Sequence, residues 1–218
     1  MAMQRCFNLC EEELCFMLFL LSNDLFMFDE KIERVLEDLE KTAGSFWNVP
    51  RSTGSFLNII TRAIKAKKVL EVGTSNGYSG IFLAEALSHN QGTLYTVESH
   101  KERFALAAAN FKKAGLDSHI EQILGHAPEV FVDFAKRREA QEGFDVIFID
   151  ATKMEYKSYL EALMPFLKPE GVLVADNCLS HKSELEDFLE FTQKSPFLQS
   201  TLLPFDNGLM LCLKTGNG

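Results

Sequence analysis

The sequence predicts an α/β protein with a doubly wound, Rossmann-like sheet of seven strands, mostly parallel, with an antiparallel strand in a C-terminal hairpin and helices on both faces. Short apolar runs alternate with helical stretches, a pattern typical of parallel strands joined by crossover helices. The segment 69–79 reads as a strand, a glycine-bearing turn and the start of a helix. Only residues 204–208 separate the last two apolar runs, too few for a helical crossover, so these two strands should pair antiparallel.

Length and composition indicate one globular domain. The 218 residues are 46% hydrophobic and 24% charged, which suits a sizeable core and excludes collagenous, disordered and disulfide-rich scaffolds. A net charge of −9 argues against broad binding to nucleic acids or anionic membranes. Five cysteines, an odd and sparse set, favour a reduced, cytoplasmic setting. We expect a single domain over 29–218, with helices over 29–66 and the strand-bearing core over 67–218.

Residues 1–28 form an apolar extension with three of the five Cys, four of the seven Met and five of the 19 Phe. Its unbroken apolar run, 14–21, is too short to span a bilayer, which takes about 20 residues. A secretory signal is disfavoured because three glutamates outweigh the one arginine. The cysteines lack a neighbouring His or further Cys, which disfavours a metal site. We expect an accessory helix docked on the domain or on a second copy in a homodimer, or else a natural start at Met27.

The elements of the domain follow in order. The first predicted helix has four apolar residues on one face: Ile32, Val35, Leu36 and Leu39. A loop at 47–50 precedes the second, which Ser52 or Thr53 can cap. Seven strands are predicted at 68–72, 93–98, 119–124, 144–150, 171–176, 199–203 and 209–213. Between the second and third, a capping-box pattern at 99–102 starts a helix that Gly115 ends.

The turn after the first predicted strand carries Gly73 and Gly77, at the edge where open α/β sheets bind ligands. It lacks the full G-x-G-x-x-G of dinucleotide sites, and the chain has no G-x-x-x-x-G-K-[ST] for a triphosphate. Glu71, inside the strand, would repel a pyrophosphate and suits a cationic ligand. Glu98, ending the second strand, can accept both hydroxyls of a ribose. The segment therefore predicts a site for a cationic nucleoside, and the alternative is a turn that only joins strand and helix.

Two further strands end in acidic residues: Asp150 ends the fourth, and Asp176, followed by Asn177, ends the fifth. Because adjacent parallel strands end on the same rim, these side chains can converge, and their oxygens suit a hard cation such as Mg²⁺. The alternative is that the acids only cap the helices that follow. Lys153 lies in the next loop, where its charged form is disfavoured beside a cation, so that neutral Lys153 could accept a proton.

Residues 48–214 resemble the class I S-adenosylmethionine-dependent methyltransferases, and within them the cation-dependent O-methyltransferases that include the catechol and caffeoyl-coenzyme A enzymes. The likeness rests on Glu71-Val72-Gly73 … Gly77-Tyr78-Ser79 and on the acids that end the fourth and fifth strands. Ser75 stands where many methyltransferases have glycine, and His126 and Thr152 depart from the family's pattern. The resemblance implies S-adenosylmethionine as cofactor and a metal-assisted methyl transfer to a hydroxyl group.

The same resemblance implies roles for individual residues. The cofactor-binding residues would be Val49, Glu71, Gly73, Thr74, Ser75, Gly77, Tyr78, Ser79, Glu98, His126, Ala127 and Asp150. The metal ligands would be Asp150, Asp176 and Asn177, for Mg²⁺ or another divalent cation such as Ca²⁺ or Mn²⁺. Lys153 would act as the general base, with Asp150 as the second catalytic residue.

The acceptor pocket should be lined by the segments 47–49, 178–181 and 206–208, with Trp47, Lys153 and His181 as candidates for substrate binding. Trp47 is either an aromatic wall for a planar acceptor or the packed end of a helix. His181 either touches the acceptor or simply begins the next helix. Cys178 reads as a small buried hydrophobe.

Three functions compete at this stage. The first is methylation of a small catechol-like acceptor, a vicinal diol. The second is methylation of a tRNA hydroxyuridine on the same fold, which would need a basic face. The candidates for that face form two clusters: Arg62, Lys65, Lys67 and Lys68, and Lys136, Arg137 and Arg138. The third is a non-catalytic nucleotide-binding module, which the presence of both Lys153 and the predicted metal ligands weakens.

Overall fold

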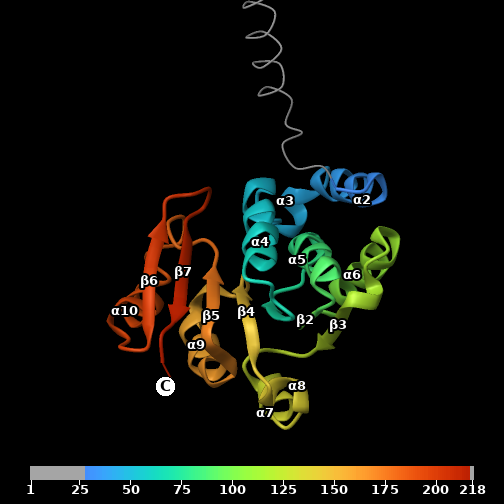
Figure 1. The fold of residues 1–218 in the computed structure, drawn as a ribbon. Helices are drawn as coiled ribbons and strands as arrows, with labels where there is room; N and C mark the ends of the chain where they lie inside the picture. The colour runs from blue at the N-terminus through green and yellow to red at the C-terminus, as the bar shows by residue number, and fades with distance from the viewer. Residues whose placement is uncertain (1–27, 217–218) are drawn as a thin grey trace, which may run out of the picture.

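A computed structural model describes residues 28–216 and contains one seven-stranded sheet between two layers of helices (Figure 1). The strand order is β3-β2-β1-β4-β5-β7-β6. The strands are β1 (Lys68–Val72), β2 (Thr93–Glu98), β3 (Ile120–Leu124), β4 (Phe144–Ile149), β5 (Leu167–Ala175), β6 (Leu198–Leu203) and β7 (Leu209–Lys214). The first five run parallel to their neighbours in this order, and β7 is antiparallel to both β5 and β6. The predicted fold class is therefore confirmed, including the C-terminal hairpin.

The helices divide between the two faces of the sheet. They are α2 (Glu30–Glu40), α3 (Ala43–Phe46), α4 (Arg51–Ala63), α5 (Tyr78–Asn90), α6 (Lys101–Ala114), α7 (Glu129–Phe134), α8 (Arg138–Gln141), α9 (Tyr156–Leu163) and α10 (Glu186–Lys194). Figure 1 shows α4, α5 and α6 on one side of the strands and α7 to α10 on the other. No helix within residues 28–216 combines the length and the apolarity needed to cross a bilayer.

The two-residue period of the strands sends alternate side chains to opposite helical layers. In β1, Val69 packs in the core beneath α4, α5 and α6, whereas Leu70 and Val72 pack beneath the other helices. Both faces are covered, so the central strands are apolar throughout rather than alternating with polar residues. The exception is Glu71, which shares the face of Val69 and is fully buried.

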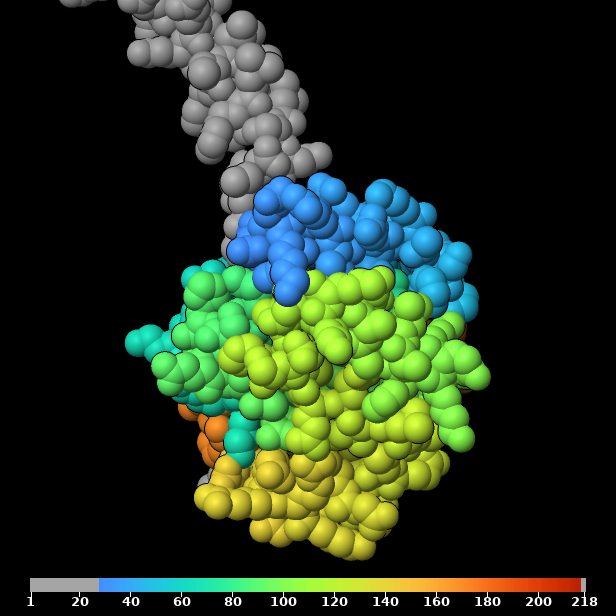
Figure 2. Space-filling model, turned by 90° about the vertical axis from the view of Figure 1, so that its right-hand side faces the viewer, coloured from blue at the N-terminus to red at the C-terminus, as the bar shows by residue number. Residues whose placement is uncertain are grey.

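The N-terminal helices lie over α5 and α6 rather than on the sheet itself. In the space-filling view the blue residues of α2 and α3 cap the green residues of those two helices (Figure 2). The four predicted apolar residues of α2 are all buried, and Phe28 packs edge-on against Phe82 with ring centroids 5.3 Å apart. Packing of this amphipathic face, rather than propensity alone, stabilises so short a helix. The expectations for residues 1–27 lie outside the described residues.

Two predicted helix caps are wrong. Helix α4 begins at Arg51 after Pro50, so Ser52 and Thr53 lie inside it, and both hydroxyls donate to Asp206 Oδ2 in the β6–β7 turn, at 2.6 and 2.7 Å. No side chain caps α6, which begins after His100. The predicted end of α6 is confirmed, since Gly115 adopts the left-handed conformation, with φ of 76°.

Candidate active site

A cavity of about 600 Å³ lies at the carboxyl ends of the parallel strands. Fifteen of the residues predicted for the site line it, and they come from segments far apart in the chain: Trp47, Val49, Gly73, Thr74, Ser75, Tyr78, Ser79, Glu98, His126, Ala127, Asp150, Lys153, Asp176, Asn177 and His181. This is the edge at which open α/β sheets bind their ligands. Gly77 and Glu71 are the two predicted site residues that do not line the cavity.

The glycine turn after β1 brings backbone close to the cavity floor. Gly73 has φ of 105°, and a Cβ there would lie 2.0 Å from the carbonyl oxygen of Asp150. Its amide donates to Val97 O at 3.0 Å, which ties the turn to the end of β2. Gly77, with φ of 89°, packs against the ring of Phe111. Only glycine tolerates such backbone conformations and such contact without strain.

Glu71 lies beneath the cavity rather than at its surface. Its two carboxylate oxygens accept hydrogen bonds from the hydroxyls of Ser79 and Thr96, each at 2.6 Å. Burial raises the pKa of this carboxyl to about 7, although the two hydroxyl donors oppose the shift. Glu71 therefore orients Ser79, which does line the cavity, and supplies negative potential from below.

Glu98 ends β2 with its carboxylate held by two backbone amides. Oε2 accepts from Ser75 N at 2.8 Å and Oε1 accepts from His100 N at 2.9 Å. These bonds fix the carboxylate at the cavity wall, where its remaining lone pairs can accept hydrogen bonds from the hydroxyl groups of a ligand.

Lys153 and Asp150 form an ion pair at the other end of the cavity. Lys153 Nζ lies 2.8 Å from Asp150 Oδ1 and donates to the hydroxyl of Tyr156 at 3.0 Å. Both partners of the pair are largely buried, with side chains 17% exposed. Burial, with the neighbouring charge of Asp150, raises the pKa of Tyr156 well above its ordinary value, so that its hydroxyl stays protonated.

Asp176 stands next to Asp150 because β4 and β5 are paired in register through Ile149 and Ala175. Its Oδ1 accepts from Asn177 N at 2.7 Å. Burial, and then the charge of Asp150, raise the pKa of Asp176 to about 7. A cation bound between these two neighbouring carboxylates would offset the repulsion of their charges.

The donor chemistry of this corner fits a hard divalent cation. Asp150, Asp176 and Asn177 offer two carboxylates and one amide oxygen, the ligand type that Mg²⁺ and Ca²⁺ prefer. Residues 28–216 contain no group of three or more His, Cys, Asp or Glu side chains placed to hold a metal, so the third protein ligand would have to be the amide.

Other predicted acceptor residues are only partly in place. Ser180, His181 and Asn207 line the cavity, whereas Cys178 is fully buried, as predicted, and its thiol donates to Ala175 O at 3.4 Å. His126 pairs with Glu129 through Nδ1 at 2.6 Å. That hydrogen bond raises the pKa of His126.

Several lining residues were not predicted from the sequence, among them Asn76, Arg103 and Tyr159, whereas Asn48 belongs to the predicted segment 47–49. Asn48 Oδ1 and Asn76 Nδ2 are buried and have no hydrogen-bond partner within residues 28–216. One is an acceptor and the other a donor, so both remain available to a polar ligand. Asn76 lies inside the glycine turn, so its position next to predicted site residues was the available signal.

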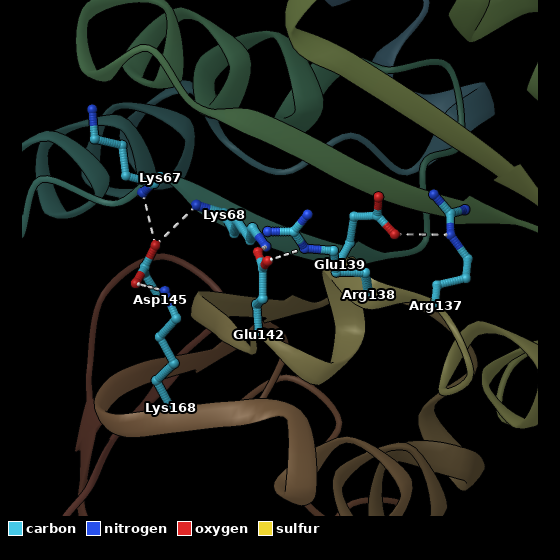
Figure 3. A network of polar contacts seen from close by, with 8 residues as sticks. All are labelled: Lys67, Lys68, Arg137, Arg138, Glu139, Glu142, Asp145 and Lys168. Carbon is cyan, nitrogen blue, oxygen red and sulfur yellow. Dashed lines mark hydrogen bonds and ion pairs between the residues drawn. The ribbon is translucent and has the colours of Figure 1, made fainter.

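Four of the seven residues in the two basic clusters form ion pairs with acids, and Figure 3 shows part of this network. Lys68 and Arg138 both pair with Glu142, and Arg137 pairs with Glu121 at 2.6 Å. Lys136 pairs with Asp133 at 2.7 Å. Lys68 begins β1, so this network lies at the end of the sheet opposite to the cavity.

Comparison with known proteins identifies the family of the chain. The family model described as O-methyltransferase matches residues 27–215. The chain is 29% identical over 206 residues to caffeoyl-CoA O-methyltransferase 2 of Zea mays, covering 89% of this chain and 78% of the relative. It is 34% identical over 140 residues to catechol O-methyltransferase of Niastella koreensis, covering 64% and 62%. The crystal structure of the Bacillus cereus O-methyltransferase in complex with SAH matches with a TM-score of 0.77 and 25% identity, over 89% of this chain and 95% of that one. The family resemblance drawn from the motifs is confirmed, and the chain belongs to the O-methyltransferase family.

Proposed function

We propose that this protein transfers the methyl group of S-adenosylmethionine to one hydroxyl of a small catechol-like diol, with the help of a divalent cation. The observation that carries the proposal is the ion pair of Lys153 and Asp150 beside Asp176, inside the same cavity as Glu98 and the glycine turn. The cavity thus places Glu98 and the glycine turn at one end, and the candidate base Lys153 with Asp150 and Asp176 at the other.

The cosubstrate fits the acidic half of the cavity. Glu98 would accept the ribose hydroxyls, while His126 and Ala127 would border the adenine. The methionine end would lie near Ser79, where the buried Glu71 contributes negative potential toward the sulfonium. The unpartnered Asn48 Oδ1 and Asn76 Nδ2 would complement its ammonium and carboxylate groups. The SAH in the Bacillus cereus structure supports the choice of cosubstrate.

Asp150, Asp176 and Asn177 would hold the cation. When bound, a divalent cation lowers the pKa of an acceptor hydroxyl and fixes the orientation of two vicinal oxygens. Proton transfer and orientation of the acceptor would be carried out by the chain's own residues. Lys153 would take the hydroxyl proton on Nζ, and the Tyr156 hydroxyl, 3.0 Å away, keeps Nζ in position. Because the sulfonium methyl is already activated, orienting the attacking oxygen is the main task of the cavity.

The paired basic clusters favour a small acceptor over tRNA. Glu142, Glu121 and Asp133 neutralise four of the seven basic residues that could have formed an RNA-binding face. Salt-sensitive binding to phosphates requires unpaired cations near the site. Relatives whose names give caffeoyl-CoA and catechol as acceptors point the same way. The free thiols of Cys178 and Cys212 suit the cytoplasmic location that we propose.

The test is transfer of labelled methyl groups from S-adenosylmethionine, with catechol-type diols and bulk tRNA as competing acceptors, in Mg²⁺ and in excess EDTA. We expect label in the diols, only with Mg²⁺. Label in tRNA alone would show that the acceptor is an RNA rather than a small diol. Full activity in excess EDTA would show that the reaction needs no divalent cation.

A further inference from the structure

Trp47 and Arg103 meet across the mouth of the cavity. Trp47 follows α3 and its side chain is 73% exposed, and Arg103 lies in the first turn of α6. The guanidinium carbon of Arg103 lies 5.2 Å from the centre of the indole ring, within the range of a cation–π contact. Both residues line the cavity.

Arg103 has no ion pair or hydrogen bond within residues 28–216, so the indole is what it contacts there. A surface arginine near acids would normally pair with one, as Arg137 does with Glu121. The guanidinium is planar and weakly hydrated, and therefore suited to stacking on a ring. The contact joins the segment after α3 to the first turn of α6, and residues of both line the cavity.

Each side of this contact is anchored to the part of the cavity assigned to the nucleoside. The carbonyl of Phe46 accepts from Ser75 Oγ at 3.0 Å, which fixes the Trp47 loop to the glycine turn. Ser75 N donates to Glu98 Oε2 at 2.8 Å, and Glu98 leads directly into α6. The segments that carry the indole and the guanidinium are therefore linked through Ser75 and Glu98, the residues assigned to the nucleoside.

The helix that leads into Trp47 has few buried contacts. Helix α3 spans four residues and buries none of them. A second cavity of about 290 Å³ lies behind Phe46, between α2 and α6. A segment with few buried contacts opens at low free-energy cost.

We propose that Trp47 and Arg103 form a clasp over the S-adenosyl cosubstrate, which must part before S-adenosylhomocysteine leaves. The inference rests on the proposed use of S-adenosylmethionine, but needs neither the cation nor the acceptor. It assigns Trp47 to retention of the cosubstrate and gives Arg103 a positioning role.

The experiment uses Trp47 as its own reporter, because it is the one tryptophan in the chain. Stopped-flow emission would follow the release of S-adenosylhomocysteine from the full-length protein. We expect the ligand to change the emission, and Arg103→Met to release it about two- to fivefold faster, the range set by an exposed cation–π contact. Arg103→Lys should release the ligand at a rate between those of the wild type and Arg103→Met. Lys101→Met, on the same helix and outside the cavity, should match the wild type.

Calorimetry separates the outcomes. Trp47→Phe should bind S-adenosylhomocysteine nearly as well as the wild type, and Trp47→Ala more weakly, with unchanged melting temperatures of the free proteins. The clasp would be overturned if Arg103→Met binds S-adenosylhomocysteine and releases it at the wild-type rate, or if Lys101→Met speeds the release as much as Arg103→Met does. Either result would leave the proposed function intact. If the wild-type protein binds no S-adenosylhomocysteine, the proposed function and the clasp both fail.

Discussion

Lys153 Nζ lies 2.8 Å from Asp150 Oδ1, so the candidate base and a candidate metal ligand of the site are already in contact. Two residues separate them in sequence, and the short helical turn over Lys153–Glu155 brings the amine back toward the end of β4. The same ammonium touches Tyr156, which is fully buried. A cation entering this corner would compete with Lys153 for Asp150, which would free the amine for the acceptor.

Replacing Lys153 tests that role. Lys153→Met keeps an unbranched side chain that ends one atom short of the amine, and should lower kcat roughly 100-fold or more, as expected for loss of a general base. The affinity for S-adenosylhomocysteine should stay within a factor of two (about 0.4 kcal/mol), and kcat should lose most of its dependence on pH. Lys157→Met, one turn further along α9, is the matched control. An unchanged pH–rate profile in Lys153→Met would remove it as the base.

Removing one carboxylate tests the cation. Asp176→Asn preserves shape but removes a charge beside Asp150, and should reduce turnover roughly 100-fold. Calorimetric binding of S-adenosylhomocysteine should persist, and raising Mg²⁺ should recover part of the rate. Glu184→Gln, an exposed change a few residues on, is expected to behave as the wild type. Equal loss of cosubstrate binding in Asp176→Asn would point to a structural role instead.

The buried Glu71 makes stability depend on pH. Because its pKa is about 7 in the folded protein against 4.5 ordinarily, the folded state retains a proton that the unfolded state releases between these values. Its stabilising contribution is therefore complete below pH 4.5 and is lost as the pH rises through 7. Glu71→Gln should melt roughly 5 °C above the wild type at pH 8 and near it at pH 4.5. Thermal unfolding at both values checks this, with the exposed Glu161→Gln as control. Equal shifts at both pH values would contradict it.

Strand periodicity and turn chemistry account for what the sequence could predict. All seven strands are found at the expected places, and the acids that follow β4 and β5 meet because parallel strands end on one rim. The alternation of side chains along β1 could also have shown that Glu71 shares a face with Val69, the face that packs beneath α4, α5 and α6. The contact of Trp47 with Arg103 had no such signal, since it depends on how α3 and α6 sit across a cavity.

The insertion of β7 between β5 and β6 was equally out of reach. A five-residue gap predicts a hairpin, but not which of its strands pairs with the rest of the sheet. The turn of this hairpin also supplies Asp206, which receives the hydroxyls that were expected to cap α4. Tertiary partners thus replaced the local caps that the sequence pattern indicated.

Gly73 sets the geometry that joins the two halves of the site, and it offers the sharpest test of the glycine turn. A Cβ at this position would lie 2.0 Å from Asp150 O, and the backbone φ of 105° is itself strained for alanine. Gly73→Ala must therefore push the turn away from the end of β4, moving Ser75 and Asp150 apart. We expect a lower melting temperature, and a loss of both cosubstrate binding and turnover.

Gly44→Ala in α3 is the matched control, because a Cβ there meets nothing within 4 Å and alanine favours the helix. It should melt at or slightly above the wild-type temperature with activity retained. Normal S-adenosylhomocysteine binding in Gly73→Ala, measured by calorimetry, would show that the close approach of these backbones is not needed for the site.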